Sequence, residues 1–222
     1  SVVSWGSEMC IRDSTGERSR WTNSIFGGMP TYQMAPSYDS TKSLSWVEKT
    51  YQLYLPEYVV LTFIMMLGFY ILLRAFGISA WLAGFGGIIW AFSSYFFILI
   101  PAGHIWKFVT LAYIPPTIAG IVLAYRRKYL LGGIITALFI ALQIRSNHIQ
   151  MSYYFMFVIL FIIGAYFEEA YKKKELTHFF KASAILALAA MVGVCINLSN
   201  LYHTYESVSY THLRAHETTL HL

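Results

Sequence analysis

Charged residues are scarce in this sequence. Only 12% of its 222 residues are Asp, Glu, Lys or Arg, whereas 57% are hydrophobic and 18% are aromatic. Because soluble domains are about one quarter charged, this composition argues against an ordinary water-soluble protein and indicates one that lies in a membrane. The formal net charge of +5 comes from basic residues that border apolar runs, which favours membrane orientation over nucleic-acid binding. We therefore expect membrane lipid as a partner and no nucleic acid.

Cysteine is also rare, and no secretory signal peptide is visible at the start of the chain. Cys10 and Cys195 have no spacing that indicates a disulfide framework or a metal site. The sequence therefore predicts no metal site within these residues.

Both ends of the chain differ from the rest. Residues 1–14 show no sustained periodicity, and residues 207–222 carry histidines at a spacing that could suit zinc: His212, His216 and His221. Both segments resemble peptides translated from sequencing adapters. We expect them to be non-native and exclude them from the functional argument, as one would a fusion scar.

Long apolar runs fill most of the remaining sequence. A bilayer core takes about 20 apolar residues per helix, and a soluble bundle does not fit because residues 80–102 hold no charge. The sequence predicts an all-α fold, a polytopic transmembrane helix bundle over residues 58–206 with a preceding extracytoplasmic loop over residues 15–57. About six spans are expected, at residues 58–76, 80–100, 109–125, 129–144, 150–167 and 180–200.

Basic residues fall on alternate connections between these spans. They lie at Arg74, in "YRRKY" (125–129), in "EEAYKKKE" (168–175) and at Lys181. Because cytoplasmic loops carry an excess of Lys and Arg, these connections are predicted to face the cytoplasm. The other connections are then extracytoplasmic: residues 15–57, 103–107, 145–151 and 199–206.

Polar residues gather in two of the outward connections. Two basic groups, two histidines and two amides there could bind an anion such as a phosphate or pyrophosphate, since lysine offers a point charge and arginine a planar fork. The basic side chains could instead extend to lipid headgroups, and the histidines could be helix-end residues. The predicted substrate-binding residues are His104, Lys107, Arg145, Asn147, His148 and Gln150.

The segment before the first span is rich in Trp, Tyr, Met and Pro. This composition indicates an ordered outer loop, in which "TKSLSWVEKTYQLYLP" (41–56) could lie amphipathically on the membrane surface. The loop carries four carboxylates: Glu17, Asp39, Glu48 and Glu57.

Four short motifs occur in order at matching places relative to the spans. They are "WTNSIFGGMPTYQ" (21–33), "GHIWKF" (103–108), "YRRKYLLGG" (125–133) and "SNHIQMSYY" (146–154). Together they resemble the YfhO family of bacterial integral membrane proteins, over most of residues 15–206. That family is similar to GT-C glycosyltransferases, which pass a sugar from a polyprenyl-phosphate carrier to an acceptor outside the cytoplasm.

The resemblance implies a donor, an acceptor and a location. It implies a polyprenyl-phosphate-linked sugar, an envelope polymer or lipid acceptor, and a multi-pass protein of the bacterial inner (cytoplasmic) membrane. GT-C chemistry needs a general base carboxylate, for which Asp39 is the candidate within this chain. Because the chain lacks an initial Met and GT-C enzymes carry their key acidic residue early in the first outer loop, we expect an inactive fragment. The full-length protein could use a divalent metal.

A transporter or flippase of a lipid-linked anion is the alternative. It would also use outward basic residues, but it should show polar residues at the membrane midplane and internal repeats. The spans contain little beyond Ser93, Ser94 and Thr136, and no repeat is evident. A purely structural subunit would not need the outward polar cluster.

Overall fold

The computed structural model describes residues 21–22, 29–30, 42–146, 148–202 and 205. The predicted segments 1–14 and 207–222, and most of the predicted loop 15–57, lie outside them. The chain divides into two compact units, of which the larger is Ser40–Asn197. In the other unit, β1 (Trp21–Thr22) pairs antiparallel with β2 (Met29–Pro30).

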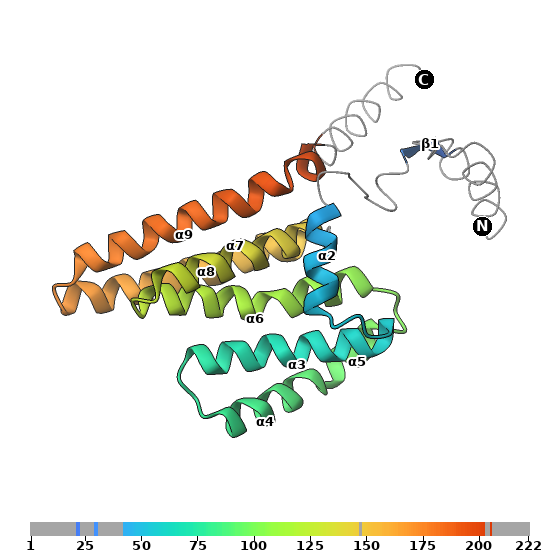
Figure 1. The fold of residues 1–222 in the computed structure, drawn as a ribbon, viewed down its shortest axis with the longest axis horizontal. Helices are drawn as coiled ribbons and strands as arrows, with labels where there is room; N and C mark the ends of the chain where they lie inside the picture. Colours follow the sequence, from blue (N-terminus) through green and yellow to red (C-terminus); the bar gives the residue numbers. More distant parts are fainter. Residues whose placement is uncertain (1–20, 23–28, 31–41, 147, 203–204, 206–222) are drawn as a thin grey trace, which may run out of the picture. The chain divides into compact units, whose positions relative to one another are not determined.

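The larger unit is an all-α helical bundle, as predicted (Figure 1). Four of its helices include segments long and apolar enough to cross a membrane: Tyr58–Ala75, Ile105–Tyr125, Gln150–Lys172 and Leu176–Ile196. By length and composition these helices make the chain a membrane protein. The helices are α2 (Lys42–Tyr51), α3 (Glu57–Ala75), α4 (Ala80–Ala91), α5 (Ser94–Leu99), α6 (Ile105–Tyr125), α7 (Tyr129–Arg145), α8 (Ile149–Lys172) and α9 (Leu176–Ile196).

The predicted span over residues 80–100 is not one helix. α4 ends at Ala91, Phe92 and Ser93 form a turn, and α5 adds six residues. Serine competes with the helix by favouring caps and turns, and Ser93 stands at the N-cap of α5 with an extended backbone (φ −62°, ψ 135°). The apolar run over residues 80–100 is therefore long enough to cross a membrane, but each of its two helices is shorter than a span.

Other helices extend beyond the predicted apolar runs. α8 continues past residue 167 to Lys172, and the Glu168–Lys172 and Glu169–Lys173 pairs lie one turn apart along it, at 2.6 and 2.5 Å. Ion pairs at this spacing stabilise the end of α8, which lies beyond the apolar run. A boundary drawn from apolar residues alone stops too early at such a charged end.

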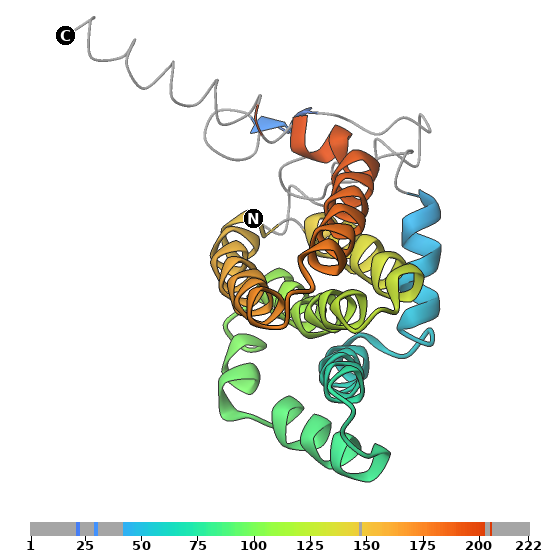
Figure 2. The same ribbon diagram turned by 90° about the vertical axis from the view of Figure 1, so that its left-hand side faces the viewer.

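α6 is the central helix. It packs against α3 and against α7, and in the end-on view of Figure 2 it lies among the other long helices. Within the segment that could span a membrane, 78% of α6 is buried, compared with 6% of the corresponding segment of α8. α8 therefore presents most of its apolar side chains to the surroundings, which suits contact with lipid.

Small residues let α6 approach both neighbours. A Cβ added at Gly132 of α7 would lie 2.5 Å from Ala124 N and 2.6 Å from Gly120 O. On the other side, a Cβ at Gly68 of α3 would lie 2.6 Å from the carbonyl oxygen of Ala112. Pro116 inside α6 removes the N–H that this oxygen would otherwise accept. Such close backbone contact is typical of membrane helix packing.

Short connections make α6, α7, α8 and α9 run alternately in opposite directions (Figure 1). One end of the bundle, the Arg145 end, holds the first residues of α6 and α8 and the last of α7. The other, the Arg126 end, holds the last residues of α3, α6 and α8 and the first of α7 and α9. The two ends carry different kinds of polar site.

Candidate functional site

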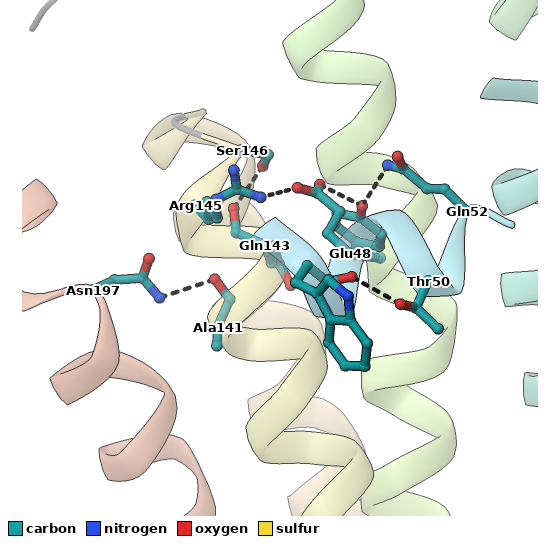
Figure 3. A network of polar contacts seen from close by, with 10 residues as sticks. Glu48, Thr50, Gln52, Ala141, Gln143, Arg145, Ser146 and Asn197 are labelled. Atoms are coloured by element: carbon teal, nitrogen blue, oxygen red, sulfur yellow. Dashed lines mark hydrogen bonds and ion pairs between the residues drawn. The ribbon is translucent and has the colours of Figure 1, made fainter. Parts of the chain in front are cut away.

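A charged network joins α2 to the last turn of α7. Arg145 Nη1 donates a hydrogen bond to Glu48 Oε2, and the Tyr113 hydroxyl donates to Glu48 Oε1 at 2.8 Å (Figure 3). Gln52 Nε2 in turn donates to the Tyr113 hydroxyl oxygen at 3.4 Å. The network therefore connects α2, α6 and α7 at the Arg145 end.

Aromatic packing positions α2 so that Glu48 reaches Arg145. The ring of Tyr51 meets Phe139 of α7 edge-on, with ring centroids 5.1 Å apart and an interplanar angle of 78°. The chain then leaves α2 through Leu53 and Tyr54, which have left-handed φ angles of 52° and 54°. This turn ends the helix directly after the residues that form the network.

The Arg145–Glu48 pair is partly protected from water. The side chains are 27% and 18% exposed, respectively. Removing water raises the cost of either charge alone, so each stabilises the other. Arginine carries five N–H donors, and among the described residues only Nη1 makes a hydrogen bond. The guanidinium therefore keeps donors for a further anion.

Buried hydroxyl and amide groups surround the end of α7. Thr110 Oγ1 of α6 lies 2.5 Å from Ser146 Oγ, and Ser146 also donates to the Gln143 carbonyl oxygen at 2.6 Å. The Gln143 side chain donates to Ser152 Oγ of α8 at 3.1 Å. These bonds fix the last turn of α7 and with it the backbone that carries Arg145.

α9 is attached to the same helix by an amide. Asn197 is fully buried, and its Nδ2 donates to the carbonyl oxygens of Ala141 at 2.9 Å and of Gly193 at 3.1 Å. One side chain thus bonds α7 and its own helix. The buried Nδ2 donor thereby ties α9 to α7, while the buried Oδ1 has no hydrogen-bond partner among the described residues.

Three of the predicted site residues have mainly local contacts. His104 is exposed at the N-cap of α6. The Lys107 ammonium lies 5.8 Å from the centroid of the Tyr95 ring, within cation–π range. Gln150 Nε2 donates to the Tyr154 hydroxyl at 3.1 Å. Within the described part of the chain no hydrogen bond or ion pair joins these residues to Arg145, so their common role in binding one ligand stays a prediction.

His148 differs from the other predicted residues. It stands at the N-cap of α8, and its buried Nδ1 has no hydrogen-bond partner among the described residues. A buried nitrogen without a partner is uncommon. The side chain of Asn147 and all of Asp39 lie outside the described residues.

Sequence reasoning missed the partners of Arg145. Glu48 was one of four loop carboxylates and was not singled out, and Tyr113 lies in the apolar run "LAYIPP". Tyr113 itself is the feature of the sequence that could have revealed this network, because a hydroxyl within a span needs a hydrogen-bond partner. Among the described residues, no group of three or more His, Cys, Asp or Glu side chains could hold a metal ion.

Comparisons of the chain with protein-family models, with curated proteins and with solved structures find no match. The class of protein is thus defined by the fold, an all-α bundle with apolar helices long enough to cross a membrane. Its function has to be argued from the Arg145 end.

Proposed function

We propose that this chain is part of an integral membrane glycosyltransferase-like protein. It would transfer a sugar from a polyprenyl-phosphate donor to a cell-envelope acceptor on the outer face of the bacterial cytoplasmic membrane. One observation carries the proposal: a partly buried guanidinium with unused N–H donors stands where apolar helices end.

The phosphate of such a donor suits Arg145. Arginine binds phosphate oxygens through parallel N–H bonds, more strongly than neutral donors do. The single bond to Glu48 leaves this geometry open. The half-buried ammonium of Lys107 and the unpartnered Nδ1 of His148 are further groups at the same end. Positive charge held in place there would stabilise the phosphate as it leaves.

Glu48 is the carboxylate best placed to act as the base. When the donor phosphate binds the free N–H donors of Arg145, Glu48 keeps its hydrogen bonds from Arg145 and Tyr113. It then takes the proton of the acceptor hydroxyl, whose oxygen attacks the anomeric carbon of the sugar. The bond from that carbon to the phosphate oxygen breaks, and its electron pair leaves with the phosphate. Asp39, predicted from the sequence, is the rival candidate for this role.

The orientation rests on charge. Arg126, Arg127 and Lys173 lie at the end opposite Arg145. Basic residues favour the cytoplasmic side, which leaves the Arg145 end outside, where GT-C chemistry takes place.

A paired measurement of binding and transfer tests the proposal. The chain is reconstituted in lipid nanodiscs and given a radiolabelled polyprenyl-phosphate sugar. We expect Arg145→Gln to weaken binding by about tenfold or more, since a charge-assisted hydrogen bond is lost. Arg74→Gln is the matched control. Arg74 donates a hydrogen bond to the Ile78 carbonyl oxygen at 2.7 Å, and it lies at the Arg126 end of the bundle.

The outcomes separate the alternatives. Glu48→Gln should retain binding and abolish any sugar transfer that the wild-type chain supports. Equal binding by wild type and Arg145→Gln would overturn the phosphate site. In proteoliposomes, movement of the labelled lipid across the bilayer without transfer of the sugar would favour a transporter instead.

A further inference from the structure

A cavity of about 390 Å³ opens at the Arg126 end, far from the site described above in the fold. It is lined by the end of α6, the last turns of α8, the start of α9 and their connections. Ligand pockets in proteins have volumes of about 300–1,000 Å³. The cavity therefore has room for a small polar group.

Stacked aromatic rings form one wall. Tyr125 stacks on Tyr166 with centroids 4.4 Å apart and an angle of 18°, and on Phe179 at 5.5 Å and 14°. The Tyr125 hydroxyl lies 2.9 Å from Ser183 Oγ. A ring face of this wall that stacking leaves uncovered suits a cation.

His178 belongs to the frame of the cavity. Its Nε2 lies 2.8 Å from the Tyr125 carbonyl oxygen and its Nδ1 lies 2.6 Å from the Tyr129 hydroxyl. Both ring nitrogens are thus engaged within the protein. The imidazole holds the start of α9 against the end of α6 and leaves ligand binding to the charged side chains.

The lining carries charges of both signs. Two ion pairs are exposed: Arg127–Glu175 at 2.7 Å and Lys173–Glu169 at 2.5 Å. Exposed pairs of this kind contribute little stability, so their members exchange partners easily. Arg126 differs, because it bonds the Ala75 carbonyl oxygen at 2.8 Å and has no carboxylate partner among the described residues.

The cavity lies near the ends of the apolar helix segments. α6 ends at Tyr125, and the apolar segment of α8 that could span a membrane ends at Lys172. The residues that follow are basic, as is common where spans meet the polar layer of the bilayer. Basic pockets between transmembrane helices are known to bind anionic phospholipid headgroups.

We propose that this cavity binds the headgroup of a zwitterionic phospholipid, with the phosphate on Arg126 and the amine between Glu169 and the Tyr166 ring. A purely anionic headgroup would gain from Arg126 but would leave Glu169 and Glu175, which are paired with Lys173 and Arg127 in the same lining, without a role in binding. An ammonium group separated from a phosphate satisfies both signs of charge. The proposal is independent of sugar transfer at the Arg145 end.

Lipid titration of the purified, delipidated chain tests this site. Native mass spectrometry would compare phosphatidylethanolamine, phosphatidylglycerol and inorganic phosphate. We expect one phosphatidylethanolamine to bind most tightly. Arg126→Gln should weaken both lipids about tenfold, and Glu169→Gln should weaken phosphatidylethanolamine alone. Arg74→Gln is the control, since Arg74 also bonds a backbone carbonyl at this end and does not line the cavity.

Three results would overturn the proposal. If Arg126→Gln bound lipid as tightly as Arg74→Gln does, Arg126 would not be part of the binding site. Glu169→Gln could leave the preference between the two lipids unchanged, which would remove the amine contact. Inorganic phosphate could compete as well as lipid at equal concentration, which would make free phosphate the ligand.

Discussion

The two ends of the bundle use the same kinds of ion pair in different surroundings. At the Arg145 end, the side chains of Arg145 and Glu48 are 27% and 18% exposed, and a buried tyrosine donates a hydrogen bond to Glu48. At the Arg126 end, Arg127 and Glu175 are 61% and 45% exposed. Water screens the second pair more than the first, which is partly protected. The first pair therefore supports the fold, and the second is free to reorganise around a ligand.

The largest expected effect comes from breaking the protected pair. Glu48→Ala leaves the Arg145 charge partly buried without its partner. We expect a loss of about 2 kcal/mol in the free energy of unfolding, between the values for exposed and fully buried pairs. Thermal melts of the reconstituted chain would measure it.

A double variant serves as the control. Glu48→Ala with Arg145→Ala should recover part of the loss, because no unpaired charge remains. If the loss of stability in the double variant equalled the sum of the losses in the two single variants, the two side chains would not interact.

A smaller effect is expected from the tyrosine that completes the network. Tyr113→Phe removes a hydrogen bond to Glu48 from a fully buried position and should cost about 1–2 kcal/mol. Tyr51→Phe is the matched control, because the buried Tyr51 hydroxyl has no hydrogen-bond partner among the described residues. That variant should be neutral or slightly stabilising, and a larger loss from Tyr51→Phe than from Tyr113→Phe would contradict the network.

Alkaline pH should act on the same end. Burial raises the pKa of Tyr51, so the folded state resists ionisation while the unfolded state ionises near pH 10. The corresponding stability is fully present below the unfolded pKa and is lost as pH rises towards the folded one. Melting temperatures between pH 9 and 11 should fall less in Tyr51→Phe than in wild type; parallel curves would exclude this contribution.

The smallest effect is expected at the exposed pair. Glu175→Gln should change the free energy of unfolding by at most about 0.5 kcal/mol. The change should vanish in about 1 M salt, where the Debye length falls to about 3 Å. A loss comparable to that of Glu48→Ala would mean that exposure does not distinguish the two ends.

The sequence predicted the bundle better than the site. Apolar runs predicted α3 and α7 to within one residue, because hydrophobic length alone decides where such helices form. The apolar run over residues 80–100 predicted a single span, but the structure has two shorter helices there. Serines can end a helix while the average hydropathy of the run stays high. Arg145 was predicted to bind an anion or to extend to lipid headgroups, and its observed partner Glu48 lies 97 residues away in the chain. No periodicity reveals contacts at that separation.

Two of the predicted binding residues contact side chains near them in the sequence. Lys107 contacts Tyr95, and Gln150 contacts a residue one turn along its own helix. Loop membership indicated which end these side chains occupy, and their directions depend on rotamers and neighbours that the sequence does not specify. His148 is the one predicted residue with a buried ring nitrogen that has no hydrogen-bond partner among the described residues.

Photochemical crosslinking tests the central claim that the Arg145 end binds polyprenyl phosphate. A diazirine-bearing polyprenyl phosphate would be irradiated with the reconstituted chain, and the labelled peptides identified by mass spectrometry. We expect label within residues 42–54 and 143–154, lost in Arg145→Gln and retained in Arg126→Gln. Label confined to residues 166–179, and unaffected by Arg145→Gln, would contradict it.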